Sequence, residues 1–377
     1  MAAEAGAMEG TDAYRQGRAA TAVAACRYWQ RRGMPTRPEQ VVAAPGAPLL
    51  LLAVLAAAGE GAVVLPRPSA EWHAAQAQLL GRPLHTVPVP AECGGVPDPV
   101  ALRETVRRAR TDGETPRVLV LSVADECTGT AVPPELLHEV CEVAGDEEML
   151  IVSDETWRDT SHAPHDTVIV SPAEMLHGGR DTDAVVVLAG LGEALLPQGP
   201  QAGIARFPDS GRGSGLAEAV RAVLAELCAG LRGSADAAAA DALTEPESLR
   251  TRRASTARAH GALLSALHRA FTEAGALCRP PHAGRHIYAD LEPVRSRLAA
   301  RGIADAARLE AELVRWLGPY VSGGDRFGDD PQALRVRLSS GLLTGGSRVP
   351  EPLGSPGVSR ALDTVRSVLS DLTGPRE

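Results

Sequence analysis

LAGLGEALLPQGPQAGI, residues 188–204, is the stretch that decides the fold. It follows the apolar run 183–189, which predicts a strand, and it leads into a second predicted strand at 203–207. Between the two strands lies a loop rich in Gly and Pro, as expected where a chain reverses direction. Glu193 lies in this loop.

The loop resembles the lysine loop of the class I/II aminotransferases, the large branch of the fold-type I pyridoxal-phosphate enzymes. In that family a Ser-Lys pair precedes an apolar run, a Pro-Gly turn, an Arg and a Gly. The two sequences align without a gap, and Gly199 and Gly203 keep the family's glycines. Gly192 and Glu193 fall on the Ser-Lys pair, and Gln201 falls on the arginine. In the family the Lys forms a Schiff base with the coenzyme and the Arg holds its phosphate, so the resemblance implies a site without either anchor.

The chain contains no lysine at all, because its 38 Lys and Arg residues are all arginines. A Schiff base needs a primary amine, which an arginine side chain cannot supply. A GC-rich codon bias, visible in the abundant Ala, Gly, Arg and Pro, explains arginine in place of surface lysine. It does not explain Glu193 at the position of a catalytic lysine. This composition suggests specialised metabolism of an actinomycete as the setting.

Composition places the chain among globular proteins. Its 377 residues suffice for one large α/β domain and a smaller one, and 44% of them are apolar. The net charge of -9 and the scattered arginines exclude a nucleic-acid partner. The six cysteines show no metal-ligand spacing, the first residues do not resemble a signal peptide, and the longest apolar run, 49–58, is too short to span a membrane. We therefore expect a cytoplasmic protein that neither crosses a membrane nor binds a metal.

Two further segments resemble the family's active-site motifs. DECTGT, residues 125–130, follows a predicted strand and resembles an Asn-Pro-Thr-Gly segment, with Glu126 in place of the Asn that contacts the coenzyme's ring hydroxyl. MLIVSDETW, residues 149–157, resembles an Asp-Glu-x-Tyr signature. Asp154 falls on the aspartate that pairs with the pyridinium nitrogen, and Trp157 falls on the tyrosine at the ring oxygen. An acid at the end of a central strand is also compatible with a structural ion pair.

The small domain contributes the expected substrate anchor. In ALRVRLSSG, residues 333–341, Arg337 falls on the arginine that binds the α-carboxylate of amino- and keto-acid substrates. A planar guanidinium suits a carboxylate because it donates two parallel hydrogen bonds. The alternative is an ordinary arginine on a surface strand.

The remaining coenzyme positions look vestigial. Gly46 and Ala47 form the turn at a helix N-terminus that would cradle the phosphate, but Pro48 removes one donor. Ala70 stands where the family has an aromatic ring on the pyridine. Trp72 lies two residues further and could replace that ring only if the loop shifted. With Gly192 and Gln201, these positions would contact a coenzyme only weakly.

The resemblance runs from about residue 14 to about residue 372. It implies a fold-type I α/β architecture, with a mostly parallel seven-stranded sheet and a smaller α/β domain, and a homodimer with its sites at the subunit interface. We expect residues 1–39 to pack with the small domain, residues 40–245 to form the large domain, and residues 246–377 to form an interdomain helix and the small domain.

The charges of the expected cleft shape the functional hypothesis. Two like charges a few Å apart repel by about 4 kcal/mol at an effective dielectric near 20, so Glu126 and Glu193 would oppose a coenzyme phosphate. We therefore expect no pyridoxal phosphate or pyridoxamine phosphate. Our hypothesis is a coenzyme-free enzyme on an amino- or keto-acid-like molecule. Glu126, Asp154 and Glu193 would be its acid and base groups, and Arg337, Trp157 and Trp72 would bind the substrate.

Two alternatives remain open. The first is a pseudoenzyme, inactive as a homodimer or paired in a heterodimer with a lysine-bearing homologue. The second is an enzyme with unattached pyridoxamine phosphate, against which Glu193 and Gln201 argue.

Overall fold

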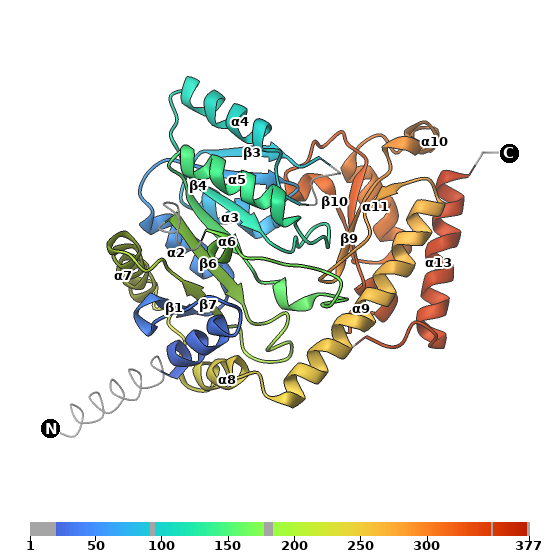
Figure 1. The fold of residues 1–377 in the computed structure, drawn as a ribbon. Coiled ribbons are helices and arrows are strands. Elements are labelled where there is room, and N and C mark those ends of the chain that lie inside the picture. The colour runs from blue at the N-terminus through green and yellow to red at the C-terminus, as the bar shows by residue number, and fades with distance from the viewer. Residues whose placement is uncertain (1–19, 91–94, 177–183, 348–349, 375–377) are drawn as a thin grey trace.

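The fold is built on a seven-stranded sheet, seen in a computed structural model that describes residues 20–90, 95–176, 184–347 and 350–374 (Figure 1). The strand order is β1-β7-β6-β5-β4-β2-β3, and β7 alone runs against the others. The strands are β1 (Val41–Ala44), β2 (Ala62–Arg67), β3 (Leu84–Pro88), β4 (Pro116–Ser122), β5 (Leu150–Asp154), β6 (Val185–Gly190) and β7 (Gly203–Arg206). The mostly parallel seven-stranded sheet predicted from the sequence is thus confirmed.

Both faces of this sheet are covered, which explains the uninterrupted apolar runs of its central strands. In β4, Val118 and Val120 pack into one core with α2 (Ala47–Ala57) and α7 (Gly211–Glu226). Leu119 and Leu121 alternate with them and pack into the core of the opposite face. The helices that contribute to this second core are α4 (Pro99–Thr111), α5 (Pro134–Asp146), α6 (Pro172–Met175) and α8 (Gly233–Leu243).

A second, four-stranded antiparallel sheet lies at the other end of the molecule (Figure 1). Its order is β10-β11-β9-β8, and the long helix α9 (Glu247–Glu273) leads into it from the large sheet. Its strands are β8 (Leu277–Cys278), β9 (His286–Asp290), β10 (Val321–Gly323) and β11 (Arg335–Ser339). The further helices here are α10 (Arg295–Ala299), α11 (Ala306–Leu317), α12 (Gly341–Thr344) and α13 (Pro356–Thr373), and together these elements enclose a separate apolar core.

The N-terminal segment packs differently from our expectation. Residues 20–30 are helical, and Ala25, Trp29 and Met34 lie in a core of the large sheet rather than against the small one. The physical reason is that this helix presents large apolar side chains on one face, and the exposed face of the large sheet offers the matching surface.

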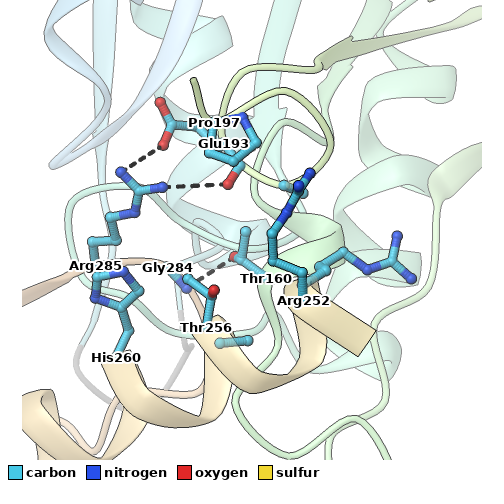
Figure 2. A pocket seen from close by; sticks show the side chains of 11 residues that line it. Thr160, Glu193, Pro197, Arg252, Thr256, His260, Gly284 and Arg285 are labelled. Carbon is cyan, nitrogen blue, oxygen red and sulfur yellow. Dashed lines mark hydrogen bonds and ion pairs between the residues drawn. The ribbon is translucent and has the colours of Figure 1, made fainter. Parts of the chain in front are cut away.

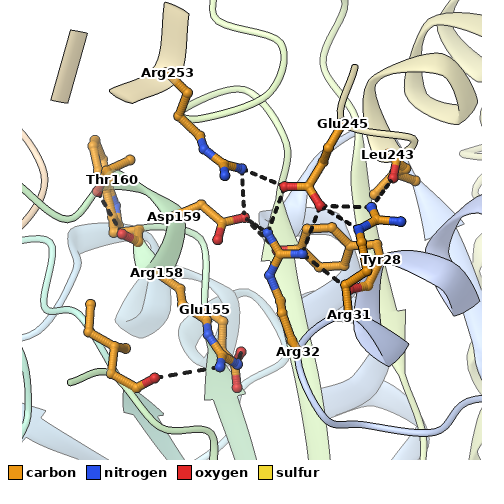
Figure 3. Close-up of polar contacts among 12 residues, drawn as sticks. Tyr28, Arg31, Arg32, Glu155, Arg158, Asp159, Thr160, Leu243, Glu245 and Arg253 are labelled. Carbon is orange, nitrogen blue, oxygen red and sulfur yellow. Dashed lines mark hydrogen bonds and ion pairs between the residues drawn. The ribbon is translucent and has the colours of Figure 1, made fainter. Parts of the chain in front are cut away.

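An arginine–carboxylate network fixes this segment to the start of α9 (Figure 3). Glu245, 6% exposed, accepts hydrogen bonds from Arg31 at 2.7 Å, Arg32 at 2.9 Å and Arg253 at 2.6 Å. Asp159, beyond β5, accepts from Arg32 at 2.6 Å. Three guanidinium groups around Glu245 lower the pKa of its carboxyl from 4.5 to about 2. The network therefore joins three segments that are distant in the sequence.

No helix in the described ranges is long and apolar enough to cross a membrane. The five cysteines at described positions are free thiols, and Cys93 lies outside those positions.

Candidate active site

The carboxyl ends of β4, β5 and β6 carry the acids singled out in the sequence. Asp154 is the last residue of β5 and is 1% exposed. One of its oxygens, Oδ1, accepts hydrogen bonds from the backbone N–H of Thr156 at 3.0 Å and from its hydroxyl at 2.5 Å. The other, Oδ2, lies 3.1 Å from His73 Nε2. Asp154 is thus a fully buried carboxylate held in a fixed orientation.

The sequence reasoning missed His73. It lies in the first turn of α3 (Glu71–Leu79), is 2% exposed, and stacks edge-on against Trp72 with ring centroids 4.2 Å apart. Its other ring nitrogen, Nδ1, is buried and has no hydrogen-bond partner among the described residues. Its position directly after Trp72 was the available signal, because a histidine there shares the loop that was expected to face the site.

Glu126 and Arg337 form an ion pair across the two sheets. Glu126 Oε1 accepts from Arg337 at 3.1 Å, and Oε2 accepts from the Trp72 indole N–H at 3.2 Å. Burial raises the pKa of Glu126, Arg337 opposes that shift, and the nearby charge of Asp154 adds to it. The structure therefore brings Glu126, Arg337, Trp72 and Asp154 together. Arg337, the expected substrate anchor, thus already holds a carboxylate of its own chain.

Glu193 is paired separately. Its Oε2 lies 3.3 Å from Arg285 Nη1, and Arg285 Nη2 donates to the Glu193 carbonyl, also at 3.3 Å. No hydrogen bond or ion pair among the described residues joins Glu193 to Glu126 or Asp154. Arg285 was not singled out in the sequence, because nothing in its surroundings resembles a motif.

Trp157 and His286 lie between these two ion pairs. Their rings meet edge to face with centroids 5.8 Å apart, and the Arg285 guanidinium carbon is 5.9 Å from the Trp157 ring centroid. His286 Nδ1 lies 3.0 Å from the carbonyl of Glu126. Burial, followed by the charge of Arg337, lowers the pKa of His286 to about 3, so this ring is neutral at pH 7. Trp157, 6% exposed, is buried in the wall between the two pairs.

The N-terminus of α2 lies at the β6–β7 end of the site. Gly46 precedes α2 with φ of 99°, a conformation that favours glycine, and β7 approaches it closely. A Cβ on Gly203 would lie 2.7 Å from the Gly46 carbonyl carbon and 2.8 Å from the Ala47 nitrogen. The Gln201 amide oxygen is 3.6 Å from the position of a Cβ on Gly46. These glycines therefore allow the loop and the helix N-terminus to meet.

Other candidates lie outside this group. Ala70 is buried at the N-cap of α3. No atom lies within 4 Å of the position that a Cβ on Gly192 would take. Within the described ranges no group of three His, Cys, Asp or Glu side chains could hold a metal ion.

Comparison with known proteins places this site in a family. A model of the class I and II aminotransferases matches residues 2–342. The chain belongs to the class I and II aminotransferase family. The recognition made from the sequence motifs is confirmed at this level.

Solved aminotransferase structures share the fold at low sequence identity. The Thermus thermophilus aspartate aminotransferase with maleate superposes with a TM-score of 0.75 at 20% identity, over 95% of this chain and 86% of the other. The alanine aminotransferase of Pyrococcus furiosus gives 0.77 at 17% identity, over 93% and 82%. The Mycobacterium tuberculosis N-succinyldiaminopimelate aminotransferase gives 0.73 at 21%, over 93% and 83%. No curated protein sequence matches this chain significantly.

Family membership corrects the cofactor expectation. The aminotransferases of this family depend on pyridoxal phosphate, so the expectation that no coenzyme binds is wrong. That expectation treated Glu126 and Glu193 as unpaired charges that would repel the coenzyme phosphate. In the fold, Arg337 and Arg285 neutralise them.

The residues of the site fit the ring end of such a coenzyme. Asp154 is a buried carboxylate aligned by His73 and Thr156, which is the partner that a pyridinium N–H requires. At the phosphate end, the N-terminus of α2 has no side-chain cap, and Gln201 lies beside Gly46.

Proposed function

We propose that this aminotransferase-family chain holds a pyridoxamine- or pyridoxal-phosphate coenzyme by non-covalent contacts and acts on an amino or keto acid. The observation that carries the proposal is the buried Asp154, fixed by His73 on one oxygen and by Thr156 on the other. A carboxylate is costly to bury, and its orientation toward the ligand end of a parallel sheet supports a ligand partner.

The coenzyme, when bound, supplies an electron sink for amine chemistry. The chain's own residues would orient it. Asp154 would accept the hydrogen bond of the pyridinium N–H and keep that proton in place. The N–H groups at the start of α2 would donate to the phosphate. Trp157 would lie beside the ring oxygen and exclude water from it.

Arg337 would bind the substrate carboxylate. Its present partner, Glu126, would have to leave the guanidinium, and the raised pKa of Glu126 supports its accepting a proton when it does so. Because Glu126 also accepts from the Trp72 indole, that hydrogen bond would retain the displaced side chain near the site.

Glu193 would move a proton in place of the family's lysine. Its Oε2 is shielded from solvent and makes no hydrogen bond among the described residues, and Arg285 Nη1 lies 3.3 Å from it. A glutamate at this position offers a side chain of the kind that general acid–base catalysis next to a coenzyme ring uses.

Native mass spectrometry tests this proposal. The protein is measured as isolated and after incubation with pyridoxal phosphate or pyridoxamine phosphate. We expect a homodimer, as is typical of relatives, with one coenzyme per subunit that is released on denaturation. Glu193→Gln should keep the coenzyme and abolish turnover. A homodimer that takes up neither coenzyme would refute the proposal and leave the pseudoenzyme alternative, which a heterodimer with a lysine-bearing homologue would support.

A further inference from the structure

A short turn, residues 157–160, follows β5 and carries Trp157. The Thr160 hydroxyl donates to the Trp157 carbonyl at 2.6 Å and accepts from the Gly284 N–H at 3.0 Å (Figure 2). A Cβ on Gly284 would lie 3.3 Å from Trp157 Cε3, so this glycine packs closely against the indole. The position of the Trp157 ring therefore depends on how this turn is held.

Asp159, in the same turn, is held by Tyr28 and Arg32 of the N-terminal segment (Figure 3). Its Oδ2 accepts from Arg32 at 2.6 Å and from the Tyr28 hydroxyl at 2.9 Å. The Arg32 guanidinium carbon also lies 3.6 Å from the Tyr28 ring centroid, so the two side chains reach Asp159 as one packed unit. Burial opposes the ionisation of Asp159, but the charges of Arg32 and Arg253 outweigh it and lower the pKa of this carboxyl. The turn thus contains a buried negative charge whose nearest cation comes from the N-terminal segment.

The neighbouring arginines Arg31 and Arg32 differ in what they hold. Both donate to Glu245, at 2.7 Å and 2.9 Å respectively. Of these two, in the part of the chain that the structure describes, only Arg32 also forms an ion pair with Asp159. The Arg32 side chain is 12% exposed, whereas that of Arg31 is 38% exposed. Replacement of either arginine therefore removes one cation from Glu245, but only replacement of Arg32 removes the nearest cation of the turn.

We propose that Arg32 is a positioning residue for the coenzyme ring: it holds Asp159, and Asp159 fixes the turn that sets Trp157 beside the ring. Docking of the N-terminal segment and recognition of the ring are then coupled, because each stabilises the same conformation of the turn. Without Arg32, the remaining cation near Asp159 among the described residues is Arg253, at 3.6 Å. A buried carboxylate that loses its closest cation is unfavourable, so the turn shifts and displaces Trp157. This role rests on the proposed function, since it requires a coenzyme beside Trp157.

Titration with pyridoxal phosphate, followed by circular dichroism in the absorption band of the coenzyme, tests the role of Arg32. Free pyridoxal phosphate is achiral, so the signal reports on the surroundings of the bound ring. We expect Arg32→Gln to bind the coenzyme about tenfold more weakly, because binding must first restore the turn, and to give a weaker signal even at saturation. Arg31→Gln is the matched control and should keep the affinity and the signal of the unmodified protein. Arg32→Lys, which keeps the positive charge, should recover part of both.

Hydrogen exchange of the coenzyme-free protein, measured by mass spectrometry, separates this role of Arg32 from the proposed function. The N–H groups of Arg158 and Thr160 are hydrogen-bonded within and just before the turn, so their exchange reports on its opening. We expect exchange at residues 157–160 to be about tenfold faster in Arg32→Gln than in Arg31→Gln. If Arg32→Gln does not fold, the same comparison is made between Arg32→Lys and Arg31→Lys.

Equal exchange in the two variants would overturn the role of Arg32, and so would equal dichroism of the coenzyme bound to them. Faster exchange in the Arg32 variant, together with no uptake of coenzyme by the unmodified protein, would support the hold of Arg32 on the turn and count against the proposed function only.

Discussion

Glu126→Gln should make the site bind anions more tightly. At 3.1 Å the Glu126–Arg337 pair has a gross attraction of about 5 kcal/mol at an effective dielectric of 20. Desolvation of the two groups, whose side chains are 17% and 18% exposed, offsets most of this attraction. A net value of about 1.5–3 kcal/mol remains for a hydrogen bond between charged groups. Because a substrate carboxylate must break that pair, its removal should strengthen binding by about tenfold to a hundredfold.

The assay is calorimetric titration with a short alkylsulfonate, which stays ionised throughout the pH range and so reports only on the protein. Burial raises the pKa of Glu126, so acidification neutralises this carboxyl earlier than an ordinary glutamate and frees Arg337. The affinity of the unmodified protein should therefore rise as the pH falls through that raised pKa, whereas Glu126→Gln should show no such rise. Glu135→Gln, an exposed acid of α5, controls for the loss of one negative charge. Unchanged or weaker binding by Glu126→Gln would show that Glu126 does not compete for Arg337.

Three further substitutions probe the surroundings of the site. Gly203→Ala should destabilise the fold by about 2 kcal/mol or more and prevent coenzyme uptake, because its Cβ would lie 2.7 Å and 2.8 Å from the backbone of Gly46 and Ala47. Gly192→Ala is the control, since no atom lies within 4 Å of the position of its Cβ. This control should unfold in urea like the unmodified protein. Glu245→Gln should cost about 2 kcal/mol at pH 7. Because the folded-state pKa of Glu245 is depressed to about 2, its contribution is complete above its ordinary pKa of 4.5 and is lost as the pH falls toward 2. Denaturation at several pH values should thus show that the free energies of unfolding of the unmodified protein and of Glu245→Gln converge in acid. The control is Glu247→Gln, at an exposed position. Glu193→Lys should form a borohydride-reducible adduct with pyridoxal phosphate, visible by mass spectrometry. A folded variant without that adduct would mean that residue 193 does not face the ring.

The central strands could be predicted from the sequence because their burial leaves a simple pattern. The predicted strand at 203–207 lies within one residue of β7 at each end. In contrast, β3 is a partly exposed edge strand that contains Pro88, and β8 is only two residues long, so neither has an apolar run to reveal it. The packing of the first helix depended on which sheet face remained open, and its own sequence does not contain that information.

The candidate site was predicted only in part. Motif positions identified Asp154, Glu126 and Arg337 because each stands within a recognisable strand or in the segment that follows one. Their partners were not identified, because the contacts join residues far apart in the chain. His73 and Asp154 are 81 positions apart, and Glu126 and Arg337 are 211 apart. Isolated acids therefore suggested a repulsive cleft, whereas the fold pairs each of them with a positive or hydrogen-bonding group.

These pairs also bear on how the site tolerates being without a ligand. A part-buried arginine without a partner is destabilising, so an anion on each of the two arginines stabilises the site when no ligand is bound. Glu126 and Glu193 supply them from within the chain, and each occupies only one of the two arginines. Because the buried Trp157, with His286 beside it, lies between the two pairs, the exchange of one glutamate for a ligand anion need not disturb the other. The effects of Glu126→Gln and Glu193→Gln on the binding of a singly charged anion should accordingly add, as for sites without shared partners. A double variant whose affinity departs from that sum by more than about 0.5 kcal/mol would show that the two positions act as one.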